Sequence, residues 1–142
     1  MGLVHTEITL KNVEDKIKAK IGLIPVQEIR QMTTTALVDT GAWTLIINEA
    51  TRKELGLDYS GKSQSVLLDT STLANGEKDE YNMAGPVEVH WKDRRVICEA
   101  LVLPNADDIL LGAIPLEAMD LTINPKRELI GKHGDQIMHK IY

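Results

Sequence analysis

The sequence predicts an all-β domain with one or two short helices. Segments in which apolar and polar residues alternate, the pattern of a strand with one buried face, recur along the chain. They lie at residues 4–10, 17–24, 87–91 and 95–103. Turn-forming pairs such as Asn75-Gly76 and Lys92-Asp93 separate segments of this kind. At 142 residues with 43% apolar content and no Phe, we expect one domain over residues 1–142 with an aliphatic core.

The first half of the chain begins with a strand at residues 4–10, and the alternation resumes over residues 17–24. Lysines alternate with other residues here and predict one solvated strand face: Lys11, Lys16, Lys18 and Lys20. Pro25 permits an edge strand or its end. Residues 29–38 then predict a strand that ends in Leu37-Val38, and Leu45–Ile47 predicts a buried strand.

A short helix is predicted directly after Ile47. Asn48 is a favourable N-cap, residues 49–55 place an acidic residue first and basic residues later, and Gly56 suits a left-handed C-cap. A helix of this length is not stable alone in water, so we expect it to dock through Ala50 and Leu55.

In the second half, Asn75-Gly76 predicts a hairpin turn between residues 66–74 and 77–83, which Gly85-Pro86 ends. Residues 87–91 and 95–103 predict a further hairpin.

Ile109–Leu111 is apolar throughout and predicts a strand buried on both faces, after which Gly112 lets two backbone segments approach closely. Pro115 suits the first position of a one-turn helix over residues 116–119, and residues 121–125 and 128–130 predict final strands.

Charge and composition exclude several classes of function. A net charge of −5 argues against a nucleic-acid partner, which needs a clustered basic face. Neither a leader pattern nor a membrane-length apolar run is present, so we expect a cytoplasmic protein with no membrane partner. The four histidines lack metal-ligand spacing, Cys98 fits a small strand residue, and no metal or cofactor is predicted.

Residues 36–42 deliver Asp39, Thr40 and Gly41 into a sharp turn between two apolar runs. The ordinary interpretation of such a tripeptide is a β-turn in which the aspartate bonds its own backbone. Together with Ile109-Leu110-Leu111-Gly112, however, this stretch resembles the retropepsin-like aspartic proteases over about residues 15–130.

The resemblance implies a retropepsin-like closed β-barrel, one lobe per chain, with Asp39 as the catalytic residue. Thr40 would brace two such loops across a symmetry axis, Gly41 would leave room for substrate backbone, and Ala42 would lie beside the cleft. A flap over bound peptide would comprise Leu73, Ala74, Asn75 and Gly76, although an ordinary exposed hairpin would have the same sequence pattern.

The chemistry of this family requires two carboxylates that share one proton, one acting as base and the other as acid. Asp69-Thr70-Ser71 is rejected as a second copy of the motif because Ser71 has a Cβ where the turn needs glycine. We therefore expect a homodimer in which each subunit supplies one Asp39. Residues 131–142 are either a disordered end or a strand added to the partner's sheet.

The predicted function is that of an aspartic endopeptidase acting on peptide or protein substrates, with activity favoured at acidic pH. Trp43 and Ala113 occupy positions where viral relatives carry an acidic residue and an arginine, so that ion pair is absent. Two alternatives stay open: a catalytically silent peptide-binding or dimerisation module with the same fold, and another small β-barrel in which Asp39 only caps a turn.

Overall fold

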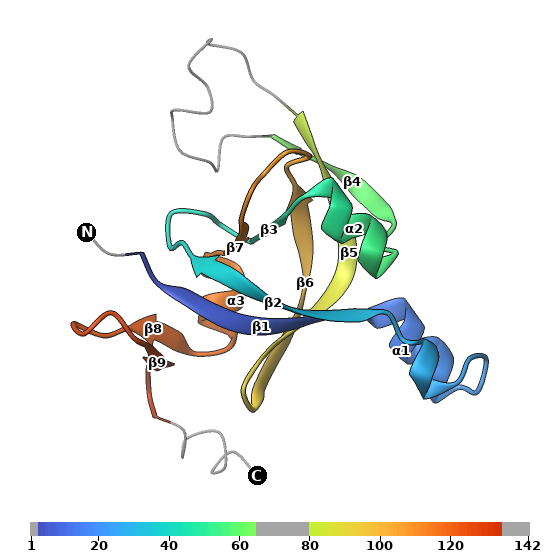
Figure 1. Cartoon of the computed structure of the whole chain (residues 1–142), viewed down its shortest axis with the longest axis horizontal. Coiled ribbons are helices and arrows are strands. Elements are labelled where there is room, and N and C mark those ends of the chain that lie inside the picture. The colour runs from blue at the N-terminus through green and yellow to red at the C-terminus, as the bar shows by residue number, and fades with distance from the viewer. Residues whose placement is uncertain (1–2, 65–79, 135–142) are drawn as a thin grey trace.

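A closed β-barrel forms the body of the protein (Figure 1). The computed structural model describes residues 3–64 and 80–134. One sheet within these residues contains seven strands: β1 (His5–Asn12), β2 (Gln31–Val38), β3 (Leu45–Ile47), β4 (Tyr59–Gln64), β5 (Glu80–Trp91), β6 (Arg94–Val102) and β7 (Ile109–Leu111). Their order is β1-β2-β7-β3-β6-β5-β4, and β1 also pairs with β5. That last pairing closes all of them except β4 into a barrel, which confirms the predicted fold class.

The barrel interior is aliphatic, as the absence of Phe predicts. Fully buried side chains from four strands include Ile8, Leu10, Leu45, Ile47, Val87, Val89 and Leu111. Trp91 is the bulky exception, and its indole Nε1 donates to Thr6 Oγ1 at 2.7 Å. Since β2 pairs in parallel with β7 and β3 in parallel with β6, the short central strands are enclosed on both sides.

Helix α2 (Glu49–Leu55) confirms the predicted caps. Asn48 Oδ1 accepts from the Thr51 amide at 2.8 Å, and Gly56 has φ of +64°, the left-handed conformation expected at this end. The predicted docking face is half wrong, because Leu55 is buried but Ala50 is exposed. Thr51 is the second buried residue, since it lies four positions before Leu55 on the same helix face.

The strand predicted over residues 17–24 is wrong. Helix α1 (Val13–Lys20) occupies this part of the chain instead, and a 3₁₀ turn follows at Val26–Glu28. Asn12 Oδ1 accepts from the amide of Asp15, and Asp15 in turn accepts two side-chain hydrogen bonds from Arg30. Of the four lysines predicted on one strand face, Lys11 lies on β1, whereas Lys16, Lys18 and Lys20 belong to α1. The Asp15–Arg30 ion pair fastens this helix to the chain entering β2.

Strand β5 runs without a break through Gly85-Pro86, where the sequence predicts an end. The strand accommodates the pair by a register shift against β6 between Ala84 and Val87. The β5–β6 hairpin itself is confirmed, with Lys92 at φ of +52° in its turn. The hairpin predicted around Asn75-Gly76 lies outside the described residues.

Helix α3 (Ala113–Ala118) has Gly112 as its N-cap, so Pro115 is its third residue and not its first. Strands β8 (Leu121–Ile123) and β9 (Leu129–Gly131) then form the predicted final hairpin. With α3, the described chain has three α-helices where the sequence predicts one or two.

Residues 135–142, most of the predicted dimerisation tail, lie outside the description. Within the described ranges, no helix has the length and apolar character required to cross a membrane.

Candidate active site

Asp39 lies where β2 leaves the barrel. Its amide donates to the Leu111 carbonyl at 3.0 Å, which extends the parallel pairing of Val38 with Leu111 by one step. The Ala42 amide donates to the Asp39 carbonyl at 3.1 Å, and the Gly41 amide donates to Asp39 Oδ1 at 2.9 Å. The carboxylate is therefore fixed to its own turn, a geometry that both a catalytic loop and an ordinary aspartate turn would show.

The four predicted residues of this loop differ in their access to solvent. Asp39 is half-buried, and Thr40 and Gly41 are exposed. Ala42 is only 3% exposed, because it packs with Ile46 and other residues of a small apolar cluster beneath the loop. The structure thus brings a carboxylate, a hydroxyl and a glycine amide together at the surface, above a packed floor.

Gly112 confirms the predicted close approach of two backbone segments. A Cβ at this position would lie 2.3 Å from the Thr44 carbonyl oxygen and 2.6 Å from that of Ala42. The residues that follow donate to the Asp39 loop: Ala113 N to Ala42 O and Ile114 N to Trp43 O, both at 2.8 Å. These two hydrogen bonds clamp the loop to the start of α3.

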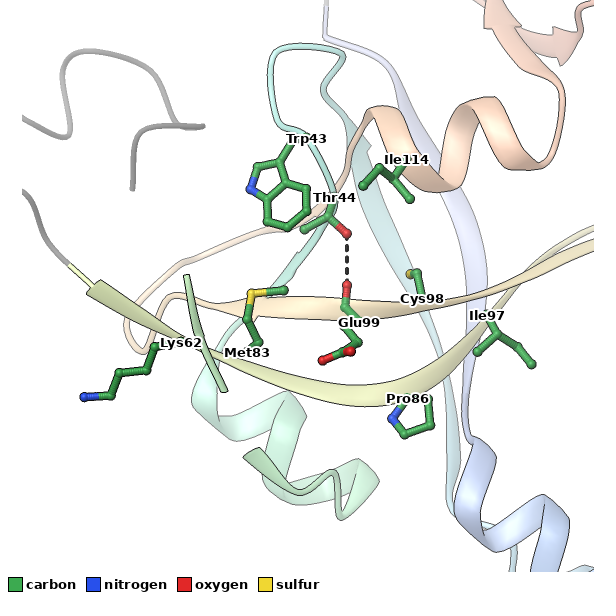
Figure 2. Close-up of a pocket in the computed structure, with 9 residues that line it drawn as sticks. All are labelled: Trp43, Thr44, Lys62, Met83, Pro86, Ile97, Cys98, Glu99 and Ile114. Atoms are coloured by element: carbon green, nitrogen blue, oxygen red, sulfur yellow. Dashed lines mark hydrogen bonds between the residues drawn. The ribbon is translucent and has the colours of Figure 1, made fainter. Parts of the chain in front are cut away.

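An open hollow of about 650 Å³ begins beside this loop, lined by residues from several elements. Figure 2 shows Trp43 and Thr44 from the loop, Met83 from β5, Glu99 from β6 and Ile114 from α3 around it. Thr44 Oγ1 donates to the Glu99 carbonyl at 2.9 Å, which ties the loop to the wall formed by β6 (Figure 2). We call this space the loop hollow.

The walls of the loop hollow are mostly apolar, and its one thiol is inert. Burial raises the pKa of Cys98 to about 12, so the sulfur stays protonated at neutral pH and is a poor nucleophile. This agrees with Cys98 being a small strand residue. Among the described residues, no group of three or more His, Cys, Asp or Glu side chains is arranged to hold a metal ion.

The sequence did not identify most residues of the loop hollow, because its walls combine residues more than fifty positions apart. The one useful signal was the alternation over residues 95–103, which indicates that Ile97 and Glu99 lie on the same face of a strand. The predicted flap residues Leu73, Ala74, Asn75 and Gly76 lie outside the described part of the chain, so their position against Asp39 stays a prediction.

Comparison with known proteins supports the resemblance. A family model described as "gag-polyprotein putative aspartyl protease" matches residues 26–118, more than half of the chain. No curated protein matches the sequence significantly. The matched region runs from the turn before β2 to the end of α3 and so contains the Asp39 loop, Gly112 and every strand of the barrel except β1. The chain belongs to this aspartyl protease family, whose members are retropepsin-like.

Proposed function

We propose that the protein is an aspartic endopeptidase in which Asp39 and Asp39 of the partner subunit activate a water molecule for peptide hydrolysis. The observation that carries this proposal is the placement of one carboxylate at the mouth of the barrel, on a loop fixed by main-chain hydrogen bonds to Leu111, Ala113 and Ile114. A reacting carboxylate must be positioned before the substrate arrives, and this loop is held without any contribution from side-chain charge.

The need for a dimer follows from the number of carboxyl groups that the reaction requires. Hydrolysis requires one ionised carboxylate to draw a proton from water and one protonated carboxyl to donate to the substrate carbonyl. Within the described residues, the Asp39 carboxylate accepts a hydrogen bond from the Gly41 amide, and no other carboxyl group forms a hydrogen bond with it. A two-fold axis through the loop would supply the second carboxyl group, and exposed Thr40 would then meet its own symmetry mate.

The substrate we propose is an extended peptide. The loop hollow offers apolar walls for a side chain next to the Asp39 loop, among them Trp43, Met83 and Ile114. Main-chain hydrogen bonding to an extended chain would fix its register, as in other cases of strand addition. In this proposal the flap comprises residues 73–76 and closes over the peptide.

A digest of a mixed peptide pool at several pH values tests the proposal. We expect Asp39→Asn to lower cleavage at least about 100-fold, because the amide cannot act as base or acid. Asp107→Asn is the matched control, since it makes the same change at an exposed loop residue. Cleavage that survives in Asp39→Asn would refute the mechanism.

Sedimentation of the wild-type protein and of Asp39→Asn tests the dimer separately. Both should sediment as dimers, because the substitution removes chemistry and leaves the rest of the interface unchanged. A wild-type protein that stays monomeric at micromolar concentration while it cleaves peptides would exclude the shared dyad. A dimer that binds peptides without cleaving them would favour a silent peptide-binding module.

A further inference from the structure

A second hollow of about 370 Å³ lies where α1 packs beside the barrel. Its walls combine cationic and apolar side chains: Lys16, Ile17 and Lys20 from α1, and Arg95 and Ile97 from β6. We call these five residues the basic groove. Ile17 and Ile97 are 54% and 56% exposed, so the groove presents apolar surface to solvent between its charges.

Two of the three cations in the basic groove have no anionic partner in the described chain. Lys16 Nζ contacts Glu88 Oε1 at 2.5 Å, and His90 Nε2 contacts the same oxygen, so the single buried carboxylate here is already satisfied. No ion pair joins Lys20 or Arg95 to another described residue. A surface with two uncompensated positive charges therefore exists on a protein whose net charge is −5.

The basic groove adjoins the loop hollow at Ile97. Ile97 lines both of them, and in Figure 2 it stands at the end of the loop hollow opposite to Trp43. The exposed side chains of β6 follow one another along this path as Glu99, Ile97 and Arg95, while the residues between them face the core. Four residues of strand cover roughly 13 Å, which is also the reach of about four residues of extended peptide.

We propose that the basic groove binds an acidic and apolar segment of the peptide substrate, about four residues beyond the residue that contacts Thr44. This inference rests on the proposed function of the Asp39 loop. The loop hollow carries one charge of each sign, on Lys62 and Glu99, whereas Lys20 and Arg95 make the far end positive and attract a carboxylate. The groove thus gives the substrate a charge pattern, with apolar residues near the cleaved bond and acidic ones away from it.

An anionic membrane surface fits this site less well than a peptide does. Membrane recognition by charge uses clusters of about four to eight basic residues, whereas the basic groove has two unpaired cations. Its shape also favours a narrow chain, because α1 forms one wall and β6 the other.

Cleavage of a degenerate pool of fourteen-residue peptides tests the proposal. Products identified by mass spectrometry should show Asp and Glu enriched more than about four positions from the cut, on one side only. The double variant Lys20→Glu/Arg95→Glu should reduce this enrichment at least about fivefold, since each exposed pair contributes a factor of a few. The control Lys18→Glu/Lys53→Glu makes the same change of charge at exposed residues outside the groove and should keep the enrichment.

Two outcomes of the digest would overturn the proposal. One is a pool that is cleaved with no charge preference beyond four positions. The other is an equal loss of preference in the control variant, which would mean that bulk charge and not the groove selects the peptide.

A binding measurement separates this proposal from the protease proposal. Fluorescein-labelled Asp-Leu-Glu-Leu-Asp-Leu and Lys-Leu-Lys-Leu-Lys-Leu peptides are titrated against Asp39→Asn protein, which needs no turnover. Tighter binding of the acidic peptide, lost in Lys20→Glu/Arg95→Glu, would support the groove even if no peptide is cleaved. Equal binding of both peptides, or binding only to vesicles with 30% phosphatidylserine, would overturn it.

Discussion

Replacing Gly112 by alanine should weaken the fold at the Asp39 loop. Gly112 has φ of −95°, an ordinary value for any residue, so the whole effect of the new Cβ is steric. That atom would lie 2.3 and 2.8 Å from the carbonyl oxygen and amide nitrogen of Thr44, which are backbone atoms that cannot rotate away. Separating the segments disrupts the hydrogen bonds that Ala113 and Ile114 donate to the loop. Two such bonds at about 1 kcal/mol each and about 1–3 kcal/mol for overpacking give a loss of roughly 3–5 kcal/mol.

Urea unfolding at one fixed protein concentration measures this loss. With a slope of about 1–3 kcal/mol per molar urea, Gly112→Ala should lower the midpoint by about 1 M or more. The control is Gly22→Ala, at φ of +82° with no atom within 4 Å of the new Cβ, where only the backbone conformation costs about 1–2 kcal/mol. If the free energy of unfolding of Gly112→Ala lies within about 0.5 kcal/mol of the wild-type value, the close approach at Gly112 does not stabilise the loop as described.

Two further predictions concern charged groups away from the loop. Arg94→Met should lower the free energy of unfolding in urea by about 2–4 kcal/mol. The buried guanidinium donates to the Met119 and Asp120 carbonyls at 2.7 and 2.9 Å, and both carbonyls would lose this donor. A decrease below about 1 kcal/mol would contradict this prediction. Hydrogen bonds from Arg52 hold the pKa of Glu49 at about 2, below its ordinary 4.5. Because the folded pKa is the lower one, this stabilisation is present above pH 4.5 and is lost as the pH falls toward 2. Glu49→Gln should remove that part of the pH dependence of the urea midpoint, and an unchanged dependence would contradict the assignment.

Local signals explain which elements the sequence could predict. The sequence predicted both ends of helix α2 because its capping residues, Asn48 and Gly56, form their hydrogen bonds within a few residues along the chain. Helix α1 carries the same kind of signal, since Asn12 is its N-cap, two acidic residues follow, and two lysines occupy its last turn. The helix was not predicted because every second residue of 16–20 is a lysine, which gives the alternating pattern of a strand. The helix also buries few apolar side chains, so no helical pattern of apolar residues supported the signal from its N-cap.

Barrel closure and the hollows depend on contacts that the sequence does not encode locally. β1 meets β5 through pairs such as Leu10 with Val89, nearly eighty residues apart, and no turn signal announces that contact. Arg94 has the composition of a surface residue but is 2% exposed, because the carbonyls at the end of α3 surround its guanidinium. Ile97 lines both the loop hollow and the basic groove, and these hollows form only when α3 and α1 pack beside β6.

The missing ion pair at Trp43 and Ala113 has a structural counterpart. In this chain the same two segments are joined by main-chain hydrogen bonds, which Ala113 N donates to Ala42 O and Ile114 N donates to Trp43 O. Main-chain hydrogen bonds do not depend on which side chains are present, so the Asp39 turn stays anchored to the start of α3 without that ion pair. Position 43 takes no part in such a pair, and Trp43 lines the loop hollow instead. If the proposed function is correct, Trp43 is the side chain that a peptide residue beside Asp39 would contact, while the main-chain hydrogen bonds keep the carboxylate in place.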